Sequence, residues 1–245
     1  LIGVAFLVPF LWFALTGRIE RAMVPRLIFL FVLGGMQGVL GWWMVMSGLV
    51  ERTEVSQYRL AAHLGLATLI YGALIWTALD MFHGRSRRFL SGLSKAALAL
   101  IVLVFAQTIL GAFVAGIRAG LIYNTWPLMD GNFIPTGLGT LSPWYINFFE
   151  NITTVQFDHR MLAYVLVALV LWQTIGFARS ASDERAVGSA GLLAAVVLAQ
   201  MGIGIWTLLK GVPLALGLLH QGGAAVVIAA ATLHLHVMTR AASRG

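Results

Sequence analysis

Seven long apolar segments divide the sequence, and polar residues separate them. They cover about residues 1–16, 27–49, 60–80, 96–117, 159–178, 190–209 and 213–238. Each is close to the roughly 20 residues that a helix needs to cross a bilayer, although the first is shorter. The pattern therefore predicts an all-α polytopic membrane protein with about seven spanning helices.

The composition agrees with a membrane protein and narrows its chemistry. Of the 245 residues, 60% are hydrophobic and 10% are charged, whereas soluble domains carry roughly 25% charged residues. The sequence contains no cysteine, which excludes disulfides, thiolate ligation of haem, iron–sulfur clusters and thiolate zinc sites. The net charge of +7 comes from the segments between apolar runs. We therefore expect a lipid bilayer, and no nucleic acid, as partner.

Positive residues gather in alternate connections between the apolar segments. The basic side carries Arg18, Arg21, Arg26, Arg85, Arg87, Arg88, Lys95, Arg240 and Arg244. By the positive-inside rule this side, with the C-terminus, faces the cytoplasm or the mitochondrial matrix.

Three histidines then lie near the outer ends of predicted helices: His63, His159 and His220. An ionisable side chain at the edge of hydrocarbon is costly, so each histidine is a candidate functional residue. Two histidines that face each other in a helix bundle can ligate one haem iron. The alternative is three hydrogen-bonded interfacial side chains.

The neighbours of these histidines give weaker signals. Small residues on the face of His220, at Gly217, Gly223 and Ala224, leave room for a flat ring or for close helix packing. Asp158 and Arg160 flank His159, where they could orient its imidazole, reach haem propionates or simply be solvated at the start of the helix.

The remaining histidines are less strong candidates. His83 lies among arginines and is expected to be a solvated loop residue. His234 and His236 lie near the inner end of the last helix and are expected to be interfacial.

The sequence also repeats itself. Gln37-x-x-x-Gly41-x-Trp43 recurs as Gln200-x-x-x-Gly204-x-Trp206, and Gln107-x-x-x-Gly111 is a weaker third occurrence. We expect the three glutamines to join helices by hydrogen bonds. The repeat places a partner for His63 just upstream of Leu1, so we expect this sequence to be a piece that lacks the first helix and catalytic residues upstream of Leu1.

The repeat predicts two related halves. Residues 1–81 form an N-terminal half-bundle, residues 82–95 a basic loop, and residues 96–245 a C-terminal four-helix bundle. An outer segment, 118–157, is too long for a simple connector. It contains Trp126, Trp144, Tyr145 and several prolines. We expect it to form an ordered cap over the outer end of the C-terminal bundle.

Four motifs resemble the haem A synthases, of the cysteine-free type found in proteobacteria and mitochondria. They are Asn124-Thr125-Trp126-Pro127-Leu128-Met129-Asp130-Gly131, Val155-Gln156-Phe157-Asp158-His159-Arg160, Leu219-His220-Gln221-Gly222-Gly223-Ala224 and Tyr58-Arg59-Leu60-Ala61-Ala62-His63-Leu64. The resemblance covers essentially the whole sequence.

The resemblance implies eight helices in two pseudo-symmetric four-helix bundles, each with a histidine pair. It assigns His159 and His220 to a bis-histidine haem b cofactor, and His63 to the haem O substrate site as a catalytic and iron-binding residue. The implied reaction oxidises the C8 methyl group of haem O to a formyl group, which gives haem A for terminal oxidases.

One departure concerns a carboxylate. The family's second helix opens with Glu-x-x-His-Arg, whereas the related C-terminal motif has Gln156 three residues before His159. A carboxylate can take or give a proton and an amide cannot. The difference favours chemistry in the N-terminal half and electron storage in the C-terminal half.

The resemblance further implies an inner membrane, bacterial or mitochondrial. Implied partners are haem O synthase, terminal-oxidase assembly factors and an unidentified electron donor, and a homo-oligomer stays open. Two alternatives remain. One is a b-type membrane cytochrome that passes electrons between a quinol and a partner. The other is a transporter, which the repeat alone would allow.

Overall fold

The computed structural model describes residues 1–46, 55–84, 92–179 and 183–241. The described residues form seven long helices and three short helical turns. The long helices are α1 (Ile2–Leu15), α2 (Val24–Met46), α3 (Gln57–His83), α4 (Gly92–Gly116), α6 (Ile152–Arg179), α7 (Glu184–Leu209) and α8 (Leu214–Ala241). The short turns are η1 (Ala119–Leu121), η2 (Trp144–Ile146) and α5 (Asn147–Glu150).

The helices confirm the seven segments predicted from hydropathy. The six long helices from α2 to α8 are long and apolar enough to cross a membrane, and α1 is a shorter apolar helix. The largest difference is the start of α6, which begins at Ile152 rather than near residue 159. The helix takes in these additional polar residues because several of their side chains bond to the outer segment rather than to water.

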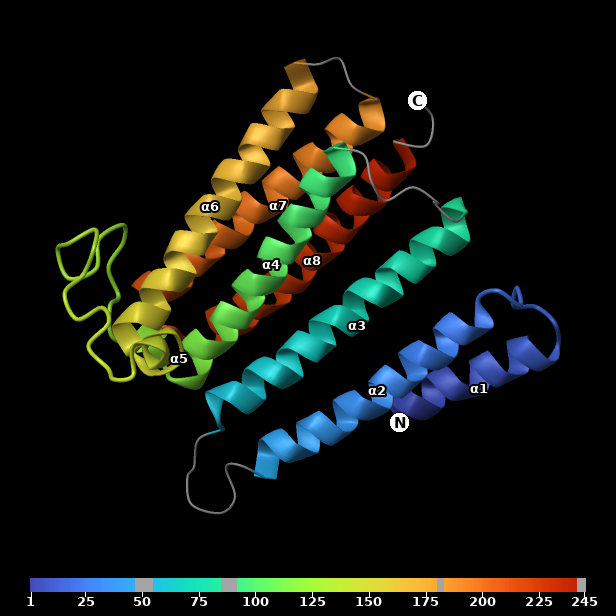
Figure 1. The fold of residues 1–245 in the computed structure, drawn as a ribbon, viewed down its shortest axis with the longest axis horizontal. Helices are drawn as coiled ribbons and strands as arrows, with labels where there is room; N and C mark the ends of the chain where they lie inside the picture. The colour runs from blue at the N-terminus through green and yellow to red at the C-terminus, as the bar shows by residue number, and fades with distance from the viewer. Residues whose placement is uncertain (47–54, 85–91, 180–182, 242–245) are drawn as a thin grey trace.

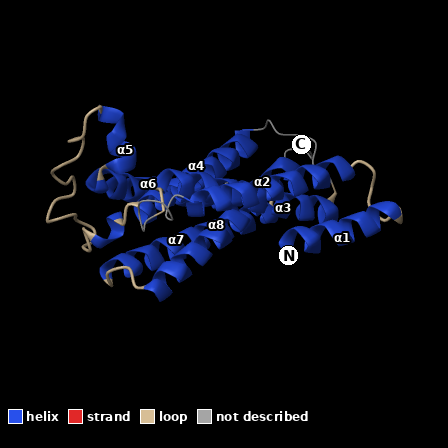
Figure 2. Cartoon of the chain, turned by 90° about the horizontal axis from the view of Figure 1, so that it is seen from below, coloured by secondary structure: helices blue, strands red, loops and turns tan. Residues whose placement is uncertain are grey.

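Four helices form a bundle in the C-terminal part of the chain. Helix α7 packs along α8 and α6, and α4 packs on α6 and α8 (Figure 1). A cluster of buried apolar residues fills the middle of this bundle, including Val104, Leu166, Leu193 and Val227. Helix α3 lies against α4 and α8, α2 against α3, and α1 against α2 (Figures 1 and 2).

The two ends of the helices differ. One end carries the long segment between α4 and α6, the α7–α8 turn and the start of α3 (Figure 1). The other end carries the α1–α2 turn, the end of α3 and the end of α8. Half of the predicted basic loop, 82–95, lies outside the described residues, and its ends belong to α3, which runs to His83, and to α4, which begins at Gly92. The division of the chain at 81 and 95 stays a prediction.

The prediction for His234 and His236 was wrong. Both side chains are buried, with exposed fractions of 0% and 1%. Nδ1 of His234 lies 2.9 Å from the hydroxyl of Ser189 on α7. Nε2 of His236 lies 3.2 Å from a carboxylate oxygen of Asp80 on α3. These residues join α8 to its neighbours instead of facing the membrane surface, because each imidazole finds a polar partner on a packed helix.

His83 is the last residue of α3 and is exposed. Its exposure agrees with the predicted solvation, although it belongs to the helix rather than to the following loop.

Candidate functional site

The three histidines occupy matching positions in three helices. His63 and His220 each lie six residues after the first residue of their helix, and His159 lies seven residues after it. Because a helix rises 1.5 Å per residue, these depths agree to within about 1.5 Å. The three histidines thus lie at similar distances from the first residues of their helices, and these helices begin at the end of the molecule that carries the long outer segment (Figure 1).

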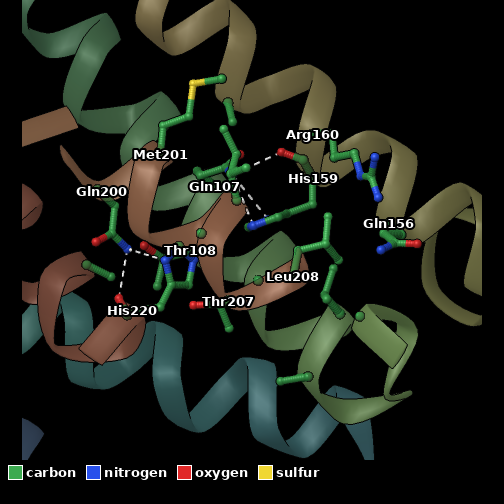
Figure 3. A pocket seen from close by; sticks show the side chains of 18 of the residues that line it. Gln107, Thr108, Gln156, His159, Arg160, Gln200, Met201, Thr207, Leu208 and His220 are labelled. Carbon is green, nitrogen blue, oxygen red and sulfur yellow. Dashed lines mark hydrogen bonds between the residues drawn. The ribbon is translucent and has the colours of Figure 1, made fainter. Parts of the chain in front are cut away.

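His159 and His220 line the same cavity, whose volume is about 540 Å³. Its walls come from all four helices of the C-terminal bundle, and Arg118, Leu121 and Trp126 of the outer segment also line it. Figure 3 shows the two imidazoles on different helices of this pocket, each beside a glutamine. A volume of this size is in the range of small-molecule and cofactor sites.

Each glutamine is fixed by the backbone of the histidine that it faces. Nε2 of Gln200 donates to the carbonyl oxygen of His220 at 2.7 Å and lies 3.2 Å from its Nδ1. Nε2 of Gln107 donates to the carbonyl oxygen of His159 at 3.0 Å and lies 3.2 and 3.3 Å from its two ring nitrogens. The glutamines therefore join α7 to α8 and α4 to α6, as predicted.

The same arrangement occurs at His63, between α2 and α3. Nε2 of Gln37 donates to the carbonyl oxygen of His63 at 3.0 Å and lies 3.3 Å from its Nε2. The weak sequence repeat thus corresponds to one local structure that occurs three times. We call it the Gln–Gly–His cradle, made of Gln37, Gly41 and His63, of Gln107, Gly111 and His159, and of Gln200, Gly204 and His220.

The glycine of each cradle leaves space for the imidazole. A Cβ atom on Gly204 would lie 2.7 Å from Cε1 of His220, and one on Gly41 would lie 3.0 Å from Cε1 of His63. On Gly111 it would lie 3.3 Å from Cε1 of His159. These distances are shorter than ordinary carbon–carbon contacts of 3.5–4.0 Å. The ring therefore rests on the helix that carries the glutamine, which is why glycine follows glutamine by one turn.

Several buried polar atoms in and around the cavity have no partner among the described residues. They are Oε1 of Gln107, Gln156 and Gln200, Nε of Arg160 and the hydroxyl of Tyr164. The residues that carry them all line the cavity. Buried polar groups are normally hydrogen-bonded, so this set indicates that the cavity accommodates a ligand with polar groups.

The cavity fits a haem with two imidazole ligands. Its walls are mostly apolar, as a porphyrin requires, and they carry two histidines on facing helices. Within the described ranges, no group of three or more histidine and acidic side chains is arranged to hold a metal ion. The two imidazoles of this pocket are the candidate ligands for the iron of a haem.

The outer segment is held against the cavity by partly buried hydrogen bonds. The guanidinium of Arg160 donates to the carbonyl oxygens of Tyr123 and Thr125 at 2.8 and 2.9 Å. Nε2 of Gln156 donates to the same oxygen of Tyr123 at 3.1 Å, and Nδ2 of Asn124 donates to Leu208 of α7 at 3.0 Å. The predicted ordered cap over the C-terminal bundle is confirmed.

Asn147 and Asn151 order the later part of this segment. Asn147 exchanges two hydrogen bonds of 2.9 Å with the backbone of Leu141, and Asn151 donates to the carbonyl oxygen of Gly137 at 2.9 Å. Both asparagines are buried, so they replace the backbone pairing that a helix or sheet would otherwise supply.

Two expectations about the neighbours of the histidines need correction. Gly217 and Ala224 line the cavity, but Gly223 serves Gln200 instead: a Cβ on Gly223 would overlap Oε1 of that glutamine. Arg160 lines the cavity, whereas Asp158 does not. The sequence could not distinguish these faces, because small residues serve both kinds of packing equally well.

Two features were missed in the sequence. Tyr164 lies within an apolar run, where no sequence pattern indicates that its hydroxyl is buried in the pocket. Asp80 is buried near the inner end of α3, 2.6 Å from Arg26 and 3.2 Å from His236. A carboxylate inside an apolar segment is the signal that could have drawn attention to this cluster.

Comparison with known proteins places this geometry in a family. The profile of the cytochrome oxidase assembly protein family matches residues 1–232. A haem A synthase of Parvibaculum lavamentivorans is 64% identical over 240 residues, which is 98% of this chain and 69% of that protein.

Two further relatives bear the same name. The haem A synthase of Sinorhizobium medicae is 49% identical over 234 residues, covering 95% of this chain and 64% of the relative. That of a Bradyrhizobium species is 48% identical over 235 residues, covering 95% and 65%. The chain thus spans less than two thirds of the length of these two relatives.

Proposed function

Because the chain belongs to the haem A synthase family, we propose that it oxidises the C8 methyl group of haem O to the formyl group of haem A. The conversion replaces two hydrogen atoms of one methyl carbon by an oxygen atom; it is a four-electron oxidation of that carbon and needs an oxygen source and a redox partner. The observation that carries the proposal is the cavity that His159 and His220 share, because its mostly apolar walls and two imidazoles would hold a haem.

His159 and His220 are the residues that would hold a haem b cofactor. Their positions at one depth, on α6 and α8, suit the two axial positions of one iron. When bound, the haem supplies reversible one-electron transfer, and two imidazole ligands leave no open position for a substrate. The apolar helix faces and the outer segment would keep bulk water from this pair.

His63 is the residue of this chain that we assign to the substrate haem. Its cradle on α2 and α3 is built like the two in the C-terminal bundle, which supports the same ligand chemistry. Nδ1 of His63 is buried, and it has no partner among the described residues. Because Gln37 faces Nε2 of His63, Nδ1 is the ring nitrogen left free to bind the iron of a substrate haem. The catalytic role of His63 is inferred from the repeat that relates the N-terminal half of the chain to the C-terminal half.

Arg160 and Tyr164 would donate hydrogen bonds to polar groups at the edge of the cofactor. The guanidinium of Arg160 donates through both terminal nitrogens to the outer segment, while its Nε has no partner in the described structure. The hydroxyl of Tyr164 is similarly placed in the cavity wall. A haem carries carboxylates that accept such hydrogen bonds.

The spanning helices support a location in a membrane. The protein is an integral membrane protein, and we assign it to the inner membrane with the histidine end outward and the basic side inward. Haem O synthase would supply its substrate, and terminal-oxidase assembly would consume its product. The electron donor that the resemblance implies is a partner of unknown identity.

The proposal is tested by haem extraction from a host that makes haem O but has no haem A synthase. Production of the full-length protein in that host should lead to haem A, which extraction and mass spectrometry detect as the formyl derivative. Membranes that contain the protein with haem B alone, while haem O accumulates unchanged, would instead indicate a b-type cytochrome.

A further inference from the structure

The three cradles share a feature that helix packing does not explain. In each, the glutamine amide nitrogen donates to the carbonyl oxygen of the histidine itself, at 2.7 to 3.0 Å. In each, the amide oxygen is buried and has no partner among the described residues. Three glutamines on three different helices thus present an unused acceptor beside an imidazole.

We propose that Gln107 and Gln200 are positioning residues for the imidazoles of His159 and His220, and that Gln37 does the same for His63. To each amide oxygen, which has no partner among the described residues, we assign the ring N–H group that remains when the other ring nitrogen binds iron. This inference rests on the proposed function, since it assigns a role to the residues behind the haem ligands.

The chemistry of a neutral imidazole requires such a partner. The ring carries a single proton, so a nitrogen that binds iron leaves the proton on the other nitrogen. That N–H group normally donates to a carboxylate, a carbonyl oxygen or water, and the bond makes the ligand more basic. The amide oxygen of glutamine is an acceptor of this kind, whereas its NH₂ group only donates.

The geometry at His220 shows how the amide of Gln200 can bond to the backbone of the histidine and to its ring. One amide hydrogen of Gln200 is committed to the backbone of His220, which fixes the amide plane, and Nδ1 of the ring lies 3.2 Å from the amide nitrogen. A ring without a proton on Nδ1 accepts the second amide hydrogen. A ring with a proton on Nδ1 turns slightly and donates to Oε1, which is bonded to the same carbon atom as Nε2.

Helix α8 itself fixes the position of Oε1. Gly223 lies one turn after His220, and a Cβ at Gly223 would overlap Oε1 of Gln200. The glycine therefore gives the acceptor its place beside the imidazole. A substitution at Gly223 therefore tests the amide oxygen of Gln200 by itself, because it displaces that oxygen while the glutamine remains.

The experiment compares two substitutions of one residue. Gln200→Leu removes donor and acceptor together. Gln200→Glu removes the donor and strengthens the acceptor. The purified holoprotein is titrated to give the midpoint potential of its low-spin haem, and haem loss to apomyoglobin is measured alongside. Gln173→Leu is the matched control, because Gln173 is a buried glutamine of α6 that does not line the cavity.

The two substitutions should shift the potential in opposite directions. A more basic ligand stabilises ferric iron, so Gln200→Glu should lower the potential and Gln200→Leu should raise it. Gln200→Leu should also release haem about 10- to 100-fold faster, in line with the loss of other such partners. Gly223→Ala should resemble Gln200→Leu, Gln107→Leu should add to its effect, and Gln173→Leu should change neither quantity.

A glutamine that only joined helices would give a different result. Glutamate and leucine both break the bond to the backbone, so shifts of the same sign, or no shift with glutamate, would overturn the inference. If Gln200→Leu does not accumulate, the sign of the shift in Gln200→Glu decides alone. Absence of low-spin haem from the unaltered protein would count against the proposed function instead.

Discussion

A carboxylate oxygen of Asp80 lies 3.2 Å from Nε2 of His236, although the two residues are 156 positions apart. The other carboxylate oxygen of Asp80 lies 2.6 Å from Arg26. These contacts join α2 and α3 to α8. Because His220 precedes His236 by 16 residues on the same helix, the cluster lies about 24 Å from the haem-site end. It is therefore a structural link between the two halves of the chain rather than part of the candidate site.

Substitution of this aspartate should weaken the molecule without altering the haem site. Asp80→Asn leaves the buried imidazole of His236 without its charged partner, which should cost about 1–3 kcal/mol. The bond to Arg26 adds little, since that side chain is one-third exposed. The midpoint of thermal unfolding in detergent should fall, while the haem spectrum stays unchanged. Glu184→Gln, at an exposed position on α7, is the control, and equal midpoints for both variants would refute the structural role.

The glycines of the cradles should respond to substitution in the order of their contacts. Gly204→Ala places a methyl group 2.7 Å from the ring of His220, whereas Gly111→Ala places one 3.3 Å from the ring of His159. We expect Gly204→Ala to lose most of the bound haem and Gly111→Ala to lose less. Gly202→Ala is the matched control on the same helix, because a Cβ there has no neighbour within 4 Å. Haem content per protein measures the series, and equal content in all three variants would show that the rings do not depend on these glycines.

Arg160 should hold the outer segment closed over the cavity. Arg160→Lys keeps the charge but cannot donate to both backbone carbonyls in the fixed geometry of a guanidinium. We expect hydrogen exchange in residues 119–128 to become faster, by an amount that reflects the loss of about 1.5–3 kcal/mol. Arg185→Lys, at the exposed start of α7 on the other end, should leave the exchange unchanged. Unaltered protection in Arg160→Lys would mean that other contacts, such as Asn124 to Leu208, suffice.

Much of this fold could be predicted from the sequence. The apolar runs fixed the seven helices, because a spanning helix needs a length that few other elements share. The equal depth of His63, His159 and His220 followed from their places in these runs. The role of Gln200 as a link between helices followed from its repeat with Gln37.

The side of each helix that faces the core could not be predicted. In a membrane, lipid-facing and core-facing positions are both apolar, so no contrast in polarity marks the buried face. This is why the burial of His234 and His236, the contact of Gly223 with Gln200, and the absence of Asp158 from the cavity wall became clear only in the structure. The pairing of Asp80 with His236 depends on a contact between α3 and α8 that no local pattern records.

His63 should be required for product but not for the C-terminal haem. His63→Ala removes the candidate ligand between α2 and α3 and leaves the cavity of His159 and His220 intact. Haem A should disappear from the extract, while the content and spectrum of haem b remain. The opposite result, with haem A still formed, would exclude His63 from the substrate site.

The identity of the axial ligands is the central claim, and electron paramagnetic resonance of the oxidised protein tests it most directly. The unaltered protein should show a low-spin ferric haem with two imidazole ligands. His159→Ala and His220→Ala should each abolish this signal, and His63→Ala should keep it. A low-spin bis-imidazole signal that persists after substitution of His159 or His220 would contradict the assignment of these residues to the haem.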